Sequence, residues 1–372
     1  MENTKELMKR RVNRRSLLQK GAMAAGAATL GAVLGAGQKL AFGQEYRDDR
    51  LTKGDIAILR FLAAAELLET DLWQQYAELG GIGDNLPVEV NPTQAMNSYQ
   101  MAFSNLDGDG PQYITSNTLD ELSHANFLNA YLESKGADSV DLSEFAHLTG
   151  SSATGSLGLG RLTNLMHLNV DTSWFIRYRS ATNPDFGATF PQAITIKNRT
   201  AIPRSDNDFD GANHIQVIAN TAAFHFGMIE QGGSSLYQAL GRKATSLEVL
   251  KITQAIGGDE TAHFLEWVDF AGNSVQAPVA GASDGGLTFP NFFTDPPNKL
   301  IQPSLIFPVP CEFISKNLPL VSVIRPTDDK FAGAQAAVAA LTADGLFTGQ
   351  SPKFFQTVQK LAEEADAARR EL

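Results

Sequence analysis

Four long segments of the sequence repeat apolar residues at the spacing of an α-helix, and each carries glutamate inside its apolar stripe. The segments span about 55–79, 117–135, 212–240 and 246–270, and each is closed by glycine. A buried ionised carboxylate is costly unless a positive group neutralises it, and no Lys or Arg lies on these stripes. The pattern therefore predicts four helices that bury acid together and need a cation to do so.

Two of the segments contain a Glu-x-x-His pair, Glu121/His124 and Glu260/His263. Residues three apart lie on one face of a helix, so each pair can direct a carboxylate and an imidazole to one point. One such pair is common by chance on a solvated face. Both pairs here continue apolar stripes, with Trp267 next along the second, which favours a buried metal site.

The other two segments each contribute a single glutamate, Glu66 and Glu230. Glu69 lies one turn from Glu66 on the same stripe, so it could replace or supplement that residue as a ligand. Each single glutamate is followed seven positions later by an aromatic residue, Trp73 and Tyr237. We expect these aromatic side chains to pack beside the site, with electron donation as the alternative.

This arrangement resembles the ferritin-like di-metal carboxylate superfamily, in which two helices each give one Glu and two each give Glu-x-x-His. Over about residues 55–272 the resemblance is to the branch of twin-arginine-exported bacterial ferritin-like proteins related to plant desiccation-associated proteins. It implies an all-α fold: an antiparallel four-helix ferritin-like bundle with a long crossover and an irregular C-terminal extension.

The resemblance also implies a ligand set for two metal ions: Glu66, Glu121, His124, Glu230, Glu260 and His263. In that set the Glu-x-x-His carboxylates bridge the ions, the histidines cap them and the single glutamates are terminal ligands. Carboxylate and imidazole without thiolate suit Fe or Mn that changes oxidation state with O₂ or peroxide. Zn would bind equally well but would be redox-silent.

The N-terminus predicts an export signal that is separate from the fold. Arg14 and Arg15 precede one hydroxyl residue and two leucines, and the uncharged run 21–37 follows. The segment resembles a twin-arginine signal, and the small-residue pattern 41–43 would leave Gln44 as the first mature residue. We expect the twin-arginine export machinery as a partner, cleavage rather than a membrane anchor, and a periplasmic or extracellular location.

The charge of the chain excludes several kinds of partner. The net charge is −11, and residues 1–43 carry eight Lys/Arg and two Asp/Glu, so their removal leaves −17. Such an acidic chain disfavours nucleic acid and anionic lipid, and no stable membrane span is expected after cleavage. Cys311 is the only cysteine, which rules out an intrachain disulfide and favours an inert thiol.

The remaining sequence is divided into two parts. Residues 44–275 form the predicted ferritin-like domain, whose crossover insert 145–211 contains an expected helix over about 157–179. Residues 276–372 are rich in Gly, Pro and Phe at first and end in two helical segments. We expect this extension to pack on the bundle, and the whole is compatible with a homo-oligomer.

Weaker signals have ordinary explanations. Residues 105–110 match the first half of a calcium loop over 105–116, but its last position is Ser116 instead of glutamate, which favours a plain turn. The histidines outside the stripes, expected to be satisfied structurally, are His147, His167, His214 and His225.

Three functions are compatible with these patterns. An exported di-metal oxidoreductase of ferroxidase, peroxidase or catalase type is favoured by the complete ligand set. The alternative is a non-catalytic ferritin-like protein that protects cells during stress or desiccation. A protein-binding module in the Phe/Pro-rich extension has no specific motif to support it.

Overall fold

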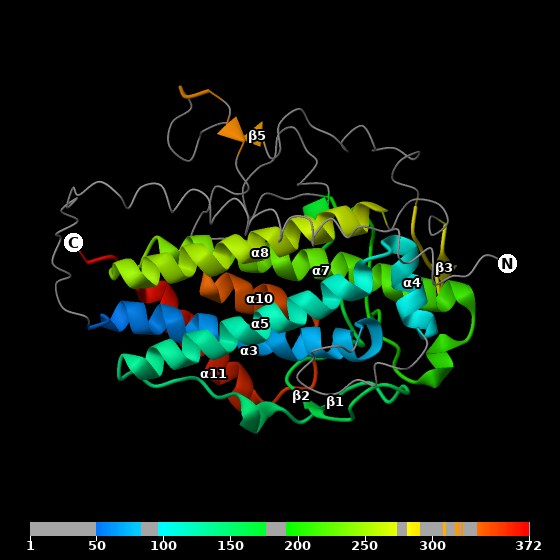
Figure 1. Cartoon of the computed structure of the whole chain (residues 1–372), viewed down its shortest axis with the longest axis horizontal. Coiled ribbons are helices and arrows are strands. Elements are labelled where there is room, and N and C mark those ends of the chain that lie inside the picture. The colour runs from blue at the N-terminus through cyan, green and yellow to red at the C-terminus, as the bar shows by residue number, and fades with distance from the viewer. Residues whose placement is uncertain are drawn as a thin grey trace, which may run out of the picture. The chain divides into compact units, whose positions relative to one another are not determined.

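The chain folds mostly into helices, as a computed structural model shows (Figure 1). The structure describes residues 50–82, 96–175, 191–273, 281–290, 308–309, 317–319, 321–322 and 333–371. The predicted signal peptide and Cys311 lie outside the described residues. Among those described, no helix is both long and apolar enough to cross a membrane. The all-α fold class is confirmed at this level.

Helix α3 (Lys53–Gly80) begins where its sequence supplies a strong N-cap. Thr52 and Asp55 form a capping box, in which the Thr52 hydroxyl oxygen accepts from the Asp55 amide at 3.0 Å. The Asp55 carboxylate also accepts a hydrogen bond from the Thr245 amide at 2.9 Å. One acidic residue therefore starts this helix and ties it to the turn that precedes another long helix.

Helix α5 (Gly110–Ser134) begins about two turns before the expected start at Asn117 or Thr118. Pro111 stands in its first turn, where a missing amide proton costs nothing. Thr118 is not an N-cap, because its hydroxyl donates to the carbonyl of Ile114 at 2.7 Å inside the helix. A short helix that the stripe pattern did not predict, α4 (Ser98–Leu106), lies just before it.

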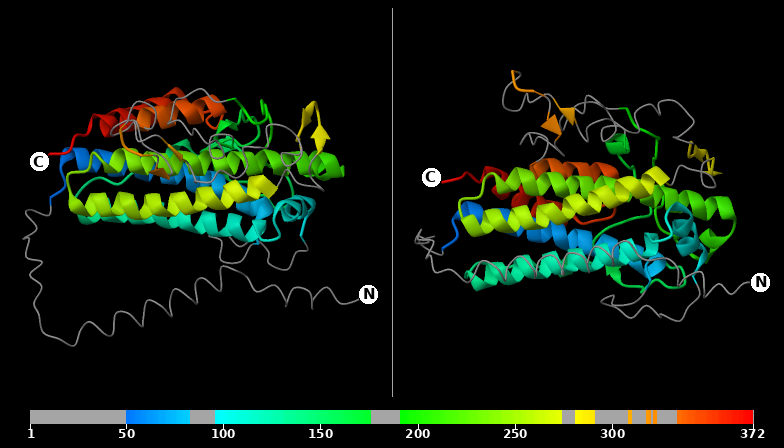
Figure 2. Two further views of the ribbon diagram at one scale, coloured as in Figure 1. Left: turned by 90° about the horizontal axis from the view of Figure 1, so that it is seen from above. Right: turned by 45° about the horizontal axis from the view of Figure 1, so that its top comes forward.

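Helices α7 (Ala212–Gly241) and α8 (Leu247–Asn273) match the third and fourth predicted segments. Helix α7 packs along α8, and α3 packs along α5. Within each pair the two helices run in opposite directions, and the four long helices lie side by side (Figures 1 and 2). Their inner faces form one apolar core.

The predicted helix over 157–179 is wrong for the residues that the structure describes. Strand β1 (Leu148–Thr149) pairs with β2 (Gly160–Arg161), and irregular chain continues to Thr172. Gly155 and Gly158 have positive φ, which breaks a helix, and the Asp71 carboxylate of α3 accepts a hydrogen bond from the Thr163 amide at 2.9 Å. Tertiary hydrogen bonds thus override the local apolar pattern.

The C-terminal extension contains both expected helices, α10 (Ala334–Asp344) and α11 (Pro352–Ala367), separated by a turn at Gly345. Helix α10 contacts α7 and α11 contacts α3. The remaining described strands form antiparallel pairs: β3 (Ser283–Asp284) with β4 (Leu287–Thr288), and β5 (Pro308–Val309) with β6 (Val321–Ser322).

Two of the histidines outside the apolar stripes are satisfied by tertiary contacts. His225 of α7 lies fully buried between the Tyr76 hydroxyl, at 2.7 Å from Nδ1, and the Asp344 carboxylate, at 3.0 Å from Nε2. It therefore joins α3, α7 and the end of α10. His214 bridges Asp208 and Asp284, each at 2.9 Å.

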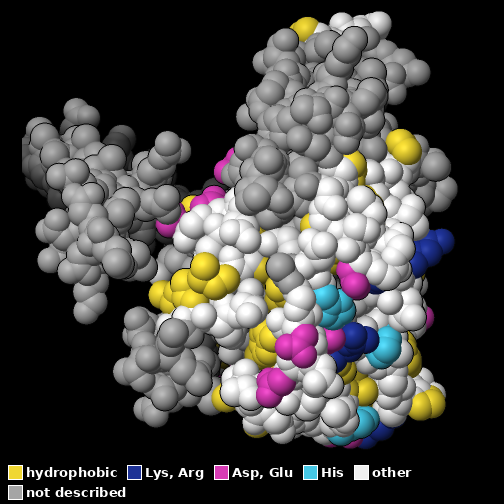
Figure 3. Space-filling view, turned by 90° about the vertical axis from the view of Figure 1, so that its right-hand side faces the viewer, with side chains coloured by type: hydrophobic (Ala, Val, Ile, Leu, Met, Phe, Trp, Pro, Cys, Tyr) yellow, Lys and Arg dark blue, Asp and Glu magenta, His cyan; other side chains and the backbone are white. Residues whose placement is uncertain are grey.

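The His214 cluster lies at one end of the helices. The start of α7 and strand β3 are at this end (Figure 1), and Figure 3 shows histidine, acidic and basic side chains gathered on it. Partial burial pulls the His214 pKa downward, but hydrogen bonds to Asp208 and Asp284 outweigh burial and raise it.

This cluster predicts a pH-dependent stability. A histidine with a raised folded pKa stabilises the fold fully below its unfolded value of 6.5, and that contribution is lost as the pH rises through the folded pKa. We expect His214→Gln to lower the free energy of unfolding more at about pH 5.5 than at about pH 8.5 in urea titrations. His167→Gln, at an exposed histidine, is the control. An equal loss for His214→Gln at both pH values would contradict this assignment.

Candidate metal centre

The four long helices bring acidic and histidine side chains together in their shared core. The glutamates are all fully buried, and His124 and His263 are 8% and 2% exposed. Helices α3 and α7 give one glutamate each, whereas α5 and α8 each give a Glu-x-x-His pair. The side chains that meet are those of the predicted ligand set: Glu66, Glu121, His124, Glu230, Glu260 and His263.

These side chains form two overlapping groups in which the candidate ligand atoms lie within 4.8 Å of one another. The first group is Glu66, Glu121, His124 and Glu260, and the second is Glu121, Glu230, Glu260 and His263. Glu121 and Glu260 belong to both groups. The geometry therefore offers two neighbouring cation positions that share two carboxylates.

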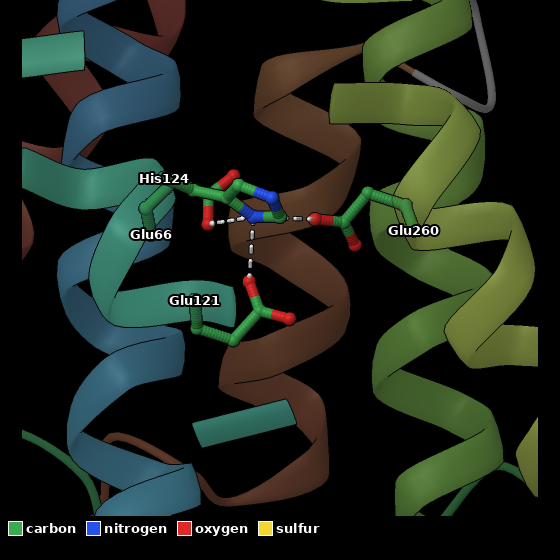
Figure 4. Close-up of side chains that lie close together, drawn as sticks. All are labelled: Glu66, Glu121, His124 and Glu260. Atoms are coloured by element: carbon green, nitrogen blue, oxygen red, sulfur yellow. Dashed lines mark hydrogen bonds and ion pairs between the residues drawn. The ribbon is translucent and has the colours of Figure 1, made fainter. Parts of the chain in front are cut away.

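The first group is centred on Nδ1 of His124 (Figure 4). This nitrogen lies 3.2 Å from Glu121 Oε2, 3.4 Å from Glu66 Oε2 and 3.7 Å from Glu260 Oε1. The four side chains come from α3, α5 and α8, so no single helix could form the group by itself.

The second group repeats this arrangement around His263. Its Nδ1 lies 3.0 Å from Glu121 Oε1 and 3.3 Å from Glu230 Oε2. Glu121 therefore presents one oxygen to each histidine, and the two imidazole rings lie 6.4 Å apart between centroids. This is how the carboxylate of Glu121 comes to belong to both groups.

Two aspartates that the sequence analysis did not single out hold the outer edges of the rings. Nε2 of His124 lies 3.3 Å from Asp259, and Nε2 of His263 lies 3.3 Å from Asp120. Each aspartate directly precedes the glutamate of the opposite pair, so both motifs are Asp-Glu-x-x-His. A carboxylate on Nε2 fixes the ring so that Nδ1 faces inward. The repeated Asp-Glu was the signal that could have revealed them.

Other polar groups orient the single glutamates. The Asn117 side-chain amide donates to Glu230 Oε1 at 2.9 Å, and the Tyr237 hydroxyl donates to Glu66 Oε1. Tyr237 thus does more than pack, whereas Trp73 stacks on Trp267 with centroids 5.3 Å apart. Asn117 was missed because nothing in its local sequence distinguishes it from a surface amide.

Several buried carboxylate oxygens at this centre have no hydrogen-bond partner of good geometry, although Glu121 Oε1 lies close to Nδ1 of His263. They are Glu66 Oε2, Glu121 Oε1, Glu230 Oε2 and both carboxylate oxygens of Glu260. Leaving a buried polar group unsatisfied costs roughly 1–3 kcal/mol, and more for a charged one. These orphaned oxygens converge on the same two positions, which is the arrangement expected of ligands for cations.

The pKa values of the buried glutamates also indicate that this site suits cations. Burial raises the pKa of Glu66 to about 8 and that of Glu230 to about 7, and it raises the pKa of Glu260 well above its usual range. Burial acts on Glu121 too, but hydrogen bonds from His124 and His263 outweigh it and lower its pKa to about 2. Protons must therefore neutralise part of this acid unless cations do. The residues fit a metal pair, and these Glu/His clusters could hold metal ions.

Two further sequence candidates lie outside these groups. Glu69 is half-buried and is not a member of either group, whereas Glu66 is. The 105–116 segment runs from the end of α4 through the turn 107–109 into α5, which contains Ser116. The side-chain amide of Asn105, at the end of α4, donates to Gln216 at 2.9 Å.

Comparisons with known proteins found no family model, curated protein or solved structure that matches this chain.

The close approach of α7 to Glu260 predicts a specific sensitivity. A Cβ atom at Gly233 would lie 2.0 Å from Glu260 Oε2, whereas one at the neighbouring Gly232 would meet nothing within 4 Å. Ala normally stabilises a helix over Gly by about 0.5–1 kcal/mol. We expect Gly232→Ala to raise the melting temperature and to retain metal affinity.

We expect Gly233→Ala instead to displace the Glu260 carboxylate, and so to weaken the binding of added Mn²⁺ or Zn²⁺ in chelator competition. Equal metal affinity in the two alanine variants would show that Glu260 takes no part in binding.

Proposed function

We propose that this protein is an exported ferritin-like protein that binds a dinuclear iron or manganese centre and performs redox chemistry with O₂ or peroxide, or oxidises Fe(II). One observation carries the proposal: Glu121 and Glu260 belong to both candidate ligand groups. Two shared carboxylates are what a pair of adjacent cations needs, because each carboxylate can serve both ions.

The ferritin-like assignment is supported by the order of the ligands along the chain. Along the chain, α3 gives a single glutamate, α5 gives a Glu-x-x-His pair, α7 gives a single glutamate and α8 gives the second Glu-x-x-His pair. That order, together with the pairing of α3 with α5 and of α7 with α8, is typical of di-metal carboxylate bundles.

In this proposal His124 and His263 would each hold one ion. Hydrogen bonds from Nε2–H to Asp259 and Asp120 would then keep the lone pair of Nδ1 directed inward. The pKa of Asp259 is lowered by its hydrogen bond with His124, which keeps this aspartate ionised and able to accept.

The single glutamates complete the two positions. Glu66 would hold the first ion and is oriented by the hydroxyl of Tyr237, while Glu230 would hold the second and is oriented by the amide of Asn117. A bound pair of Fe or Mn ions would supply one-electron steps and open positions for an oxidant.

The helices that carry the candidate ligands also bury a layer of aromatic side chains. Trp73, Phe226 and Trp267 pack against one another, with centroids 4.5 Å apart for Phe226 and Trp267. A dry environment strengthens the electrostatic interaction of carboxylates with cations. The same side chains contribute hydrophobic stability, which offsets the cost of the buried acid.

The first experiment measures metal content in protein purified from its export compartment. We expect about two Fe or Mn ions per chain, as in related carboxylate centres, and a marked loss in a Glu121→Gln/Glu260→Gln variant. Glu133→Ala, an exposed substitution on α5, is the matched control. Wild-type protein without metal, and with no rise in melting temperature on addition of Fe, Mn or Zn, would refute the metal centre.

The pH dependence of the stability of the metal-free protein distinguishes a ligand glutamate from a structural one. A glutamate whose pKa is raised by burial destabilises the metal-free fold above its unfolded value of 4.5, whereas glutamine carries no charge. We therefore expect metal-free Glu260→Gln to be more stable than metal-free wild type at about pH 8, with a smaller difference at about pH 5. A purely structural glutamate would lose stability on substitution.

A second experiment separates redox chemistry from a protective role. Protein loaded with Fe(II) or Mn(II) is mixed with O₂ or peroxide, and consumption of the oxidant is followed; the zinc-loaded protein is the redox-silent control. Turnover that requires Fe or Mn supports the proposal. Full metal loading without turnover with either oxidant would favour the non-catalytic role in stress or desiccation.

A further inference from the structure

An apolar cavity of about 90 Å³ lies beside the candidate metal centre. It lies between α3, α7 and the C-terminal helices that pack on them. Its lining is largely aliphatic and aromatic, for example Phe61, Leu68, Leu236, Val338, Phe347 and Val358. The C-terminal extension thus forms one wall of a chamber against the helices that carry Glu66 and Glu230.

The inner wall of this cavity is also a wall of the metal centre. Gly233 lines the cavity, and a Cβ atom there would lie 2.0 Å from Glu260 Oε2. Tyr237 lines it as well, and its hydroxyl donates to Glu66. Two residues of the cavity wall therefore touch candidate ligands directly, Gly233 at Glu260 and Tyr237 at Glu66.

The cavity lies where the two halves of the protein differ. Three positions after its single glutamate, α3 carries Glu69, whereas α7 carries Gly233. Both residues line the cavity. A side chain at Gly233 would occupy the place of the Glu260 carboxylate, so glycine lets that carboxylate lie against α7 where the helix borders the cavity. Glu69 supplies the only carboxyl group among the described residues of the lining.

The size and chemistry of the cavity limit what it can hold. Apolar cavities of about 150 Å³ stay dry and bind benzene or xenon, so a smaller one suits an apolar molecule smaller than benzene. Water and peroxide would lose hydrogen bonds on entry, at roughly 1–3 kcal/mol for each unsatisfied group. Dioxygen is small, uncharged and apolar, and it loses no such bonds.

We propose that this cavity holds dioxygen beside the metal pair and so makes O₂, rather than peroxide, the oxidant that the centre is built to meet. The proposal rests on the proposed function, because it names the oxidant of that same site.

The direct test uses xenon, an apolar probe that needs no metal. Crystals of the metal-free protein under xenon pressure should show xenon in the cavity.

Three variants test whether the cavity is the xenon site. Gly232 lines the cavity and has nothing within 4 Å of its Cβ position, so Gly232→Leu adds side-chain volume there while improving helix propensity. Ala65→Leu, also in the lining, is a second narrowing variant. Gly258→Leu, at an exposed glycine of α8 with equally open space, is the control.

We expect xenon in the wild type and in Gly258→Leu, and its loss in both narrowing variants. In Fe(II)-loaded protein the narrowing variants should react with O₂ several-fold more slowly, with the rate of reaction with peroxide unchanged. Absence of xenon from the wild type, an unchanged O₂ rate, or equal slowing with peroxide would each overturn the proposal.

Failure of the proposed function is recognised separately. If the protein binds no Fe, Mn or Zn, the proposed metal centre is refuted, and the proposed role of O₂ is refuted with it, whether or not xenon binds. A chain that binds metal but excludes xenon keeps the metal centre and loses only the oxygen site.

Discussion

The structure depends on four fully buried glutamates that face two imidazole rings at the centre of the long helices. Desolvation raises the free energy of every charged carboxylate in such a place, so the acid by itself opposes folding. Long apolar stripes on the same helices provide the opposing hydrophobic free energy. Cations at the two positions would turn this cost into a stabilising contribution, which makes folding and metal binding thermodynamically linked.

The surrounding polar contacts give this acidic core its geometry. Asp259 and Asp120 reach across to the histidine of the opposite pair, so α5 and α8 each orient a ring of the other. The glutamates of α3 and α7 are oriented by side chains from other helices, Tyr237 and Asn117 respectively. Because the six candidate ligands come from four helices, the spacing of the site depends on how all four long helices pack. A shift of α5 or α8 would disturb both positions, since each of these helices contributes to both groups.

Local sequence signals predicted the long helices well where packing agreed with them. The apolar stripe placed the start of α3 at about residue 55, and the helix begins at Lys53. The expected start of α5 at about residue 117 was too late, because Pro111 already stands in the first turn of that helix and the Thr118 hydroxyl bonds inside it. The predicted helix over 157–179 failed for a related reason. There, glycines with positive φ and hydrogen bonds to the carboxylate of Asp71 give the chain an irregular path, and the apolar periodicity of the sequence does not reveal either feature.

The sequence by itself determined the helical class of this protein and the acidic and histidine residues, Glu69 among them, that could serve as ligands, because helical periodicity and residue chemistry are local properties. Only the tertiary structure decided that Glu66, rather than Glu69, joins the groups and that Glu121 and Glu260 are shared. Only the tertiary structure revealed that Asp259 and Asp120 contact the histidines of the opposite pairs and that a cavity lies at Gly233. Both features depend on distances between residues far apart in the chain. Such distances follow from how the helices pack, and no single helix contains that information.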